Sequence, residues 1–198
     1  MSCLVRRLFR WVAVPVAVIA TLPFTAPALA ADVTVSDGRG DMWVIQEGAT
    51  TADPAPQESV GDFVRTTFRH TATRVVVRSK FVDLTREGRL FRMWVDMRDQ
   101  AGRRVFAKVE TTPRDRNGHT QMFGGRGRDI ACNITHRVDY AQNTVRVSFP
   151  RRCLSNPRTL QFRAFSEFSR QNLGFARIDN PNNERATSRA WTRPLRAS

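Results

Sequence analysis

Hydrophobic and polar residues alternate in seven short segments of this chain, and this alternation constrains the fold more than any other feature of the sequence. Because successive side chains of a β-strand point to opposite faces of a sheet, a period of two predicts strands with one buried face. Turn-forming residues separate the segments, and no convincing amphipathic helix lies between them. The expected strands are 63–70, 74–83, 90–98, 104–110, 130–138, 144–149 and 159–167, with weaker candidates at 42–45 and 120–123.

Seven to nine short strands predict an all-β fold. We expect a single antiparallel β-sandwich of jelly-roll or immunoglobulin-like type, and a closed β-barrel is the alternative that the pattern leaves open. The sandwich domain should span residues 62–178. We expect an irregular N-terminal segment at 31–61 and a polar C-terminal tail at 179–198, which Trp191 pins onto the body.

The first 30 residues predict export from the cytoplasm. Three arginines are followed by an apolar run at 11–22 and by Ala28-Leu29-Ala30, the small-x-small pattern of a signal-peptidase site. A membrane-spanning helix is the alternative, but the run is short and prolines interrupt it. We therefore predict a signal peptide at 1–30, cleavage after Ala30, no later transmembrane segment and an extracellular mature protein. The paired Arg6 and Arg7 leave both the general and the twin-arginine export routes open.

Export changes the meaning of the three cysteines. Cys3 lies in the signal peptide, so the mature chain keeps Cys132 and Cys153. An even pair in an oxidising compartment predicts a disulfide bond between Cys132 and Cys153. A bridge over a loop of this length stabilises a domain by about 3 kcal/mol in the chain-entropy account. Two separated thiols do not make a structural zinc site, which needs four ligands held close together.

The chain is strongly basic. Its formal net charge is +14, and removal of the signal arginines Arg6, Arg7 and Arg10 lowers this to +11. Arginine binds phosphate and carboxylate with two parallel hydrogen bonds, so the composition indicates an anionic partner. A G+C-rich genome is the alternative explanation, because arginine replaces lysine almost everywhere except at Lys80 and Lys108. Export and the lack of a nucleic-acid-binding motif exclude nucleic acid from our expectation and favour a cell-envelope polymer or an acidic glycan.

The alternation also predicts which side chains face outward on the segments 90–98 and 104–110. These include Arg92 and Trp94 on the first segment and Phe106 and Lys108 on the second. Trp94 should face either Phe106 or Lys108 across the pair. An exposed aromatic ring beside cations is typical of carbohydrate-binding surfaces. We therefore take Trp94, Phe106, Arg92 and Lys108 as candidate binding residues, with cover by a loop or by the chain terminus as the alternative.

The sequence contains no recognisable catalytic motif. GxSxG, HExxH and SxxK are absent, and His70, His119 and His136 stand far apart along the chain. We therefore expect no catalytic residues, no cofactor and no metal. Two alternatives stay open: a pair of acids brought together by the strands could act in hydrolysis, and Asp37 and Asp41 could help to bind calcium.

The region around the second cysteine resembles a family. Residues 138–154 end in Pro150-Arg151-Arg152-Cys153-Leu154, and Asn156-Pro157 follows. This hairpin and its "proline, basic, Cys-Leu, Pro" ending resemble small secreted actinobacterial proteins of uncharacterised function. The segment 73–77 and Trp191 fit as well, so the resemblance covers most of residues 60–192. It implies a secreted sandwich and supplies no activity.

These observations lead to one expected function and two alternatives. We expect a secreted, non-enzymatic protein that binds an anionic envelope polymer or acidic glycan through its basic, aromatic-containing outer face. The alternatives are a secreted hydrolase with an unrecognised acid pair, and a structural or interaction protein that meets a protein partner. The sequence leaves the oligomeric state open.

Overall fold

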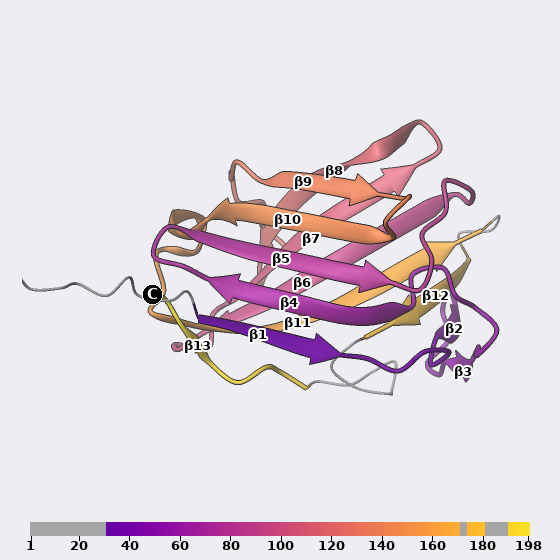
Figure 1. Ribbon diagram of the computed structural model, residues 1–198, viewed down its shortest axis with the longest axis horizontal. Helices are drawn as coiled ribbons and strands as arrows, with labels where there is room; N and C mark the ends of the chain where they lie inside the picture. The colour runs from indigo at the N-terminus through magenta and orange to yellow at the C-terminus, as the bar shows by residue number, and fades with distance from the viewer. Residues whose placement is uncertain (1–30, 171–173, 181–189) are drawn as a thin grey trace, which may run out of the picture.

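The computed structural model describes residues 31–170, 174–180 and 190–198, and the predicted signal peptide at 1–30 lies outside this range. Two antiparallel sheets lie face to face, as Figure 1 shows, and they do not close into a barrel. The predicted β-sandwich is therefore confirmed. Across the described residues no helix is both long and apolar enough to cross a membrane.

The smaller sheet has five strands, and the larger has eight. In spatial order the five-stranded sheet consists of β1 (Ala31–Ser36), β4 (Phe63–His70), β5 (Arg74–Phe81), β10 (Thr144–Pro150) and β9 (Thr135–Asp139). The larger sheet runs β3 (Asp53–Pro54), β2 (Trp43–Gln46), β12 (Phe175–Asp179), β11 (Thr159–Ser169), β6 (Leu90–Asp99), β7 (Arg104–Thr112) and β8 (Asp115–Gly124), and β13 (Leu195–Arg196) pairs with β11. A 3-10 turn, η1 (Arg151–Leu154), follows β10.

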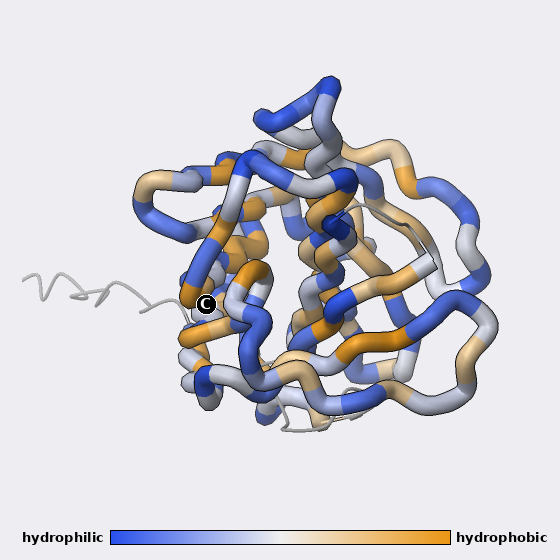
Figure 2. The backbone as a smooth tube through the Cα atoms, turned by 90° about the vertical axis from the view of Figure 1, so that its right-hand side faces the viewer, coloured by the Kyte–Doolittle hydropathy of each residue, from blue (hydrophilic) through white to orange (hydrophobic). Residues whose placement is uncertain are grey.

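The core fills the space between the two sheets. Hydrophobic and hydrophilic residues succeed each other over short distances along the backbone, as Figure 2 shows, so each strand contributes one apolar face. Phe68 of the smaller sheet stacks on Phe162 of the larger one, with ring centroids 5.1 Å apart. The core includes Phe63, Val75, Val77, Phe81, Phe91, Met93, Val95, Val109, Val145, Val147, Phe149 and Phe168.

The predicted disulfide is present. Cys132 and Cys153 are 21 positions apart and their Cα atoms lie 5.7 Å from each other. The bond joins the extended segment before β9 to η1, and both cysteines pack against the core. It therefore fixes the edge of the five-stranded sheet to the turn that leads into β11.

Six of the seven strongly predicted segments form strands over most of their length, and the two weaker candidates correspond to β2 and β8. Of the predicted segment 130–138, only residues 135–138 lie in a strand, β9. The segment 31–61 differs from our expectation, because it contributes β1, β2 and β3 to the two sheets instead of remaining irregular. These strands, with β12 and β13 near the C-terminus, have at most six residues each. Such short runs show too few alternations to stand out from loop sequence.

Candidate functional site

The four predicted binding residues lie on the outer face of the eight-stranded sheet. Trp94 of β6 pairs with Lys108 of β7, so the structure selects one of the two predicted registers. Phe106 pairs with Asp96, and Arg92 pairs with Glu110 on one side and with Glu167 on the other. The four residues thus occupy neighbouring positions, but acidic side chains alternate with the cationic ones.

The charges of Arg92 and Lys108 are neutralised within the protein. The Nε atom of Arg92 lies 2.5 Å from a carboxylate oxygen of Glu110, and its Nη1 atom lies 3.3 Å from Glu167. Lys108 Nζ lies 3.0 Å from the same Glu110 oxygen, and both side chains of this pair are about nine-tenths buried. An external anion would have to displace these carboxylates, so this surface does not favour anion binding.

The two aromatic candidates also make internal contacts. Trp94 stacks on Phe165, with centroids 5.6 Å apart, and Lys108 Nζ lies 5.5 Å from the centre of the Trp94 ring. The guanidinium of Arg104 lies 4.8 Å from the Phe106 ring centre. Trp191, near the C-terminus, contacts two adjacent arginines: the Cζ atoms of Arg98 and Arg163 lie 4.5 and 4.7 Å from the centre of its ring. The four residues therefore pack in a half-buried surface in which Arg92 and Lys108 are paired with acids.

A denser and less neutralised group of cations lies on the other outer surface of the sandwich. We use the name basic face for the outward cations of the five-stranded sheet. Arg78 of β5 lies directly opposite Arg146 of β10, which in turn lies opposite Arg137 of β9. In the next row Arg65 of β4 pairs with Lys80 of β5. The basic face comprises Arg65, Arg69, Arg74, Arg78, Lys80, Arg137 and Arg146.

Few acids neutralise the basic face. Asp32 pairs with Arg69 at 3.4 Å, and Asp139 pairs with Arg137 at 2.7 Å. Throughout the described residues no carboxylate lies within ion-pair distance of the three exposed arginines Arg65, Arg78 and Arg146. Like charges directly opposite each other destabilise a sheet.

The same surface is hollowed. A shallow groove of about 340 Å³ crosses β1, β4, β5 and the start of β10. Arg65, Arg78 and Lys80 line it together with hydroxyl and amide side chains from Thr34, Thr67, Gln142 and Thr144. Lys80 Nζ already donates to the Gln142 carbonyl oxygen at 2.6 Å, and the hydroxyls of Thr34 and Thr67 are hydrogen-bonded to each other. The guanidinium groups of Arg65 and Arg78 are not ion-paired within the described residues and no carboxylate lines the groove, so it suits an acceptor-rich anionic ligand.

Another basic region surrounds a pocket of about 410 Å³ at one end of the sandwich. Its arginines include Arg103 and Arg104, which are held by Asp99 at 2.7 Å and by the fully buried Asp96 at 2.6 Å. Arg126 and Arg128, from the loop after β8, are exposed at the same pocket. This region therefore offers fewer free cations than the basic face and serves as a matched comparison for it.

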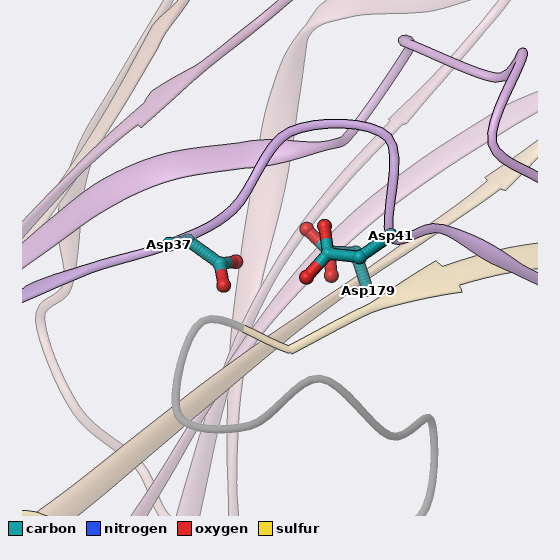
Figure 3. Close-up of side chains that lie close together, drawn as sticks. All are labelled: Asp37, Asp41 and Asp179. Atoms are coloured by element: carbon teal, nitrogen blue, oxygen red, sulfur yellow. The ribbon is translucent and has the colours of Figure 1, made fainter.

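The described residues that could hold a metal ion are aspartates. Carboxylate oxygens of Asp37, Asp41 and Asp179 all lie within 4.8 Å of one another, and Figure 3 shows the Asp37 carboxylate directed toward that of Asp41. Asp62 lies beside them, because its Oδ2 accepts a 2.8 Å hydrogen bond from the Gly40 N–H. Gly40 adopts a φ of +75°, a conformation that favours glycine and turns this N–H toward Asp62.

Burial and mutual repulsion perturb this aspartate cluster. Burial, followed by the charges of Asp179 and Asp41, raises the pKa of Asp37 to about 8. Burial raises the pKa of Asp179 to about 7, against hydrogen bonds from the N–H groups of Phe63 and Asn180. Asp37 and Asp41 are close enough in the chain to be grouped from the sequence, whereas Asp62 and Asp179 are distant from them and join the group only through the fold.

The chain was compared with known proteins. No protein-family model, no curated protein sequence and no solved structure matched it. Function must therefore be argued from the geometry of the surfaces described above.

Proposed function

We propose that this is a non-enzymatic, exported protein that binds an extended anionic polymer across its basic face. The observation that carries the proposal is the pair Arg78 and Arg146, which lie directly opposite each other on neighbouring strands with no carboxylate of the described residues within ion-pair distance. Arg137 lies opposite Arg146 on the next strand and extends the row, although Asp139 pairs with it. Unpaired like charges in such a row cost free energy in the unbound protein. A polyanion removes this repulsion by placing its own charges between the guanidinium groups.

The shape of the surface favours a polymer over a small anion. Neighbouring strands lie about 4.8 Å apart, so the row spans roughly 10 Å. The groove carries Arg65, Arg78 and Lys80, and the arginine row continues beyond it to Arg146 and Arg137 on the next two strands. A chain with repeating phosphate or carboxylate groups can contact several arginines at once, whereas a single small anion contacts one or two.

The compartment that the sequence predicts restricts the choice of polymer. A signal peptide would bring the basic face to the cell exterior, where wall polymers and acidic glycans carry the available negative charge. We therefore propose an envelope polyanion as the ligand. Phosphate-bearing and carboxylate-bearing polymers share the chemistry that arginine recognises, and the experiment distinguishes them.

Binding of two soluble probes tests this proposal: a polyol-phosphate wall polymer and polygalacturonate. The double variant Arg78→Glu/Arg146→Glu should bind its preferred polymer at least tenfold more weakly than the wild type near physiological ionic strength. The matched control Arg126→Glu/Arg128→Glu changes the net charge equally at the basic loop and should retain binding within about threefold. Both pairs of arginines are exposed, so the variants should fold like the wild type.

Two results would contradict the proposal. Wild-type protein that binds neither polymer even at very low salt has no polyanion site. Equal weakening by both double variants would show that net charge, and not the basic face, governs binding. Preference for the polyol phosphate or for polygalacturonate identifies which anionic group the face recognises.

A further inference from the structure

Four aspartates from both sheets meet at one edge of the sandwich. Asp37 directly follows β1 and Asp62 directly precedes β4, which are strands of the five-stranded sheet. Asp41 lies two residues before β2, and Asp179 is the last residue of β12, which are strands of the larger sheet. A direct link between the sheets already exists here, because the Phe63 N–H donates a 2.6 Å hydrogen bond to Asp179 Oδ2.

Several oxygens of this cluster lack a partner. Both carboxylate oxygens of Asp41, Oδ2 of Asp37 and Oδ1 of Asp62 are out of contact with solvent and accept no hydrogen bond. An anionic oxygen removed from water without a compensating partner is costly, and proteins normally satisfy such groups with hydrogen bonds or a metal ion. Four unsatisfied oxygens in one place indicate a missing positive charge.

Asp62 supplies an observation that is independent of the three closest carboxylates. Asp62 is only 2% exposed, and its Oδ1 atom has no hydrogen-bond partner, although its Oδ2 atom accepts a hydrogen bond from the Gly40 N–H. Beyond burial, the charge of Asp62 contributes to the raised pKa values of Asp37 and Asp179, and the charge of Asp41 contributes to the raised pKa of Asp62. Arg39 offsets part of this charge at Asp62, but the cluster as a whole remains acidic.

We propose that Asp37, Asp41 and Asp179 bind one calcium ion that joins the two sheets, with Asp62 beside them adding negative charge. Calcium takes six to eight oxygen ligands at about 2.3 to 2.6 Å, so two of its ligands can lie up to about 5 Å apart. The oxygens within 4.8 Å of one another fit this limit. Magnesium is held at shorter distances and usually by one or two carboxylates, and zinc sites use nitrogen or sulfur ligands that this cluster does not contain.

The same geometry argues against a catalytic acid pair. A hydrolase must present its carboxylates to a sugar ring, with space for the substrate between or beside them. Here the unpartnered oxygens are out of contact with solvent and lie close together, so no space for a sugar ring separates them. The calcium site uses none of the basic-face residues, so it can be tested independently of the proposed polymer binding.

Calorimetric titration with calcium and thermal unfolding, both on protein first treated with a chelator, test the site. Wild-type protein should bind one calcium ion per chain and melt at a higher temperature when calcium is present. Asp41→Asn keeps the shape of a side chain that makes no hydrogen bond through its carboxylate, and it removes one ligand charge. This variant should fold, lose at least tenfold in calcium affinity and show little calcium-dependent stabilisation.

Matched variants separate a specific site from general charge effects. Asp129→Asn, at an exposed position outside the cluster, should bind calcium like the wild type. Asp37→Asn should behave like Asp41→Asn. Magnesium should bind at least tenfold more weakly than calcium.

Three results would overturn the proposal. The first is the absence of binding and of a melting shift up to roughly 10 mM calcium, above the range of extracellular calcium modules. The second is unchanged calcium affinity in both Asp37→Asn and Asp41→Asn. The third is magnesium binding as tight as calcium binding, which would contradict the assignment of the site to calcium.

Discussion

At the scale of single residues, the same residue types play opposite roles on the two outer surfaces. Arg92 and Lys108 are tied to Glu110, whereas Arg78 and Arg146 face each other with no acid between them. Ion pairing with acidic side chains, and not the number of arginines, therefore decides which surface is available to an anion. Trp94 belongs to the neutralised surface, where its stacking on Phe165 serves packing.

Trp94→Ala should therefore lower stability without affecting polyanion binding. Loss of a half-buried tryptophan and its stacked contact should reduce the free energy of unfolding by roughly 2 kcal/mol, less than for a fully buried aromatic residue. Chemical denaturation measures this change, and titration with the preferred polymer measures binding. Phe175, which is 41% exposed, offers a control, because Phe175→Ala should change stability by less than about 0.5 kcal/mol. Polymer binding that disappears in a folded Trp94→Ala variant would return the site to the surface predicted from sequence.

At the scale of elements, local pattern explains what could be predicted from the sequence. The period of two lies within each strand, so segments such as 63–70 and 90–98 could be recognised without knowing their neighbours. Pairing between β5 and β10 joins residues more than 60 positions apart, as Ser79 and Val145 show. The arginine row depends on that pairing, and the aspartate cluster depends on the meeting of Asp37 with Asp179. Neither long-range arrangement follows from local alternation.

The C-terminal strand β13 is attached to the sandwich through a buried histidine. His70 of β4 is fully buried, and its Nδ1 lies 3.0 Å from the carbonyl oxygen of Leu195. A carbonyl only accepts, so Nδ1 carries the proton and donates. Burial lowers the pKa of His70, and the nearby charge of Arg151 lowers it further, against the hydrogen bond to Leu195.

This histidine predicts a pH dependence of stability. Because the folded-state pKa lies below the unfolded value of about 6.5, the unfolded chain takes up a proton more readily than the folded one. The stability that neutral His70 provides is present above the unfolded pKa and is lost as pH falls through the folded pKa. The expected observable is the difference in unfolding free energy between wild type and His70→Gln, which should shrink as the pH is lowered below about 6.5. A pH-independent difference would contradict this assignment.

The difference in unfolding free energy between the wild type and His70→Gln is the appropriate measure, because other groups titrate in the same pH range. The raised pKa values of Asp37 and Asp179, about 8 and about 7, act with the opposite sign. Their contribution to stability is present at low pH and is lost as pH rises through those values. Both proteins carry the same aspartates, so this contribution cancels when His70→Gln is subtracted from the wild type.

At the scale of the whole molecule, positive and negative charge gather in different places. The basic face covers one broad side of the sandwich, while the aspartate cluster lies at its edge where strands of both sheets meet. A calcium ion at that edge would hold the sheets together, whereas the arginine row is placed by strand pairing within the five-stranded sheet. Stability and binding would then depend on separate residues.

The salt dependence of polyanion affinity tests the central claim most directly. Each cation that neutralises a polymer charge releases condensed counterions, so the logarithm of affinity falls linearly with the logarithm of salt concentration. The account predicts that Arg78→Gln/Arg146→Gln makes this slope shallower by about 1 to 2, because two contacts are lost. Arg126→Gln/Arg128→Gln should leave the slope of the wild type unchanged. A slope that Arg78→Gln/Arg146→Gln does not alter, or that both double variants alter equally, would contradict polyanion binding at the basic face.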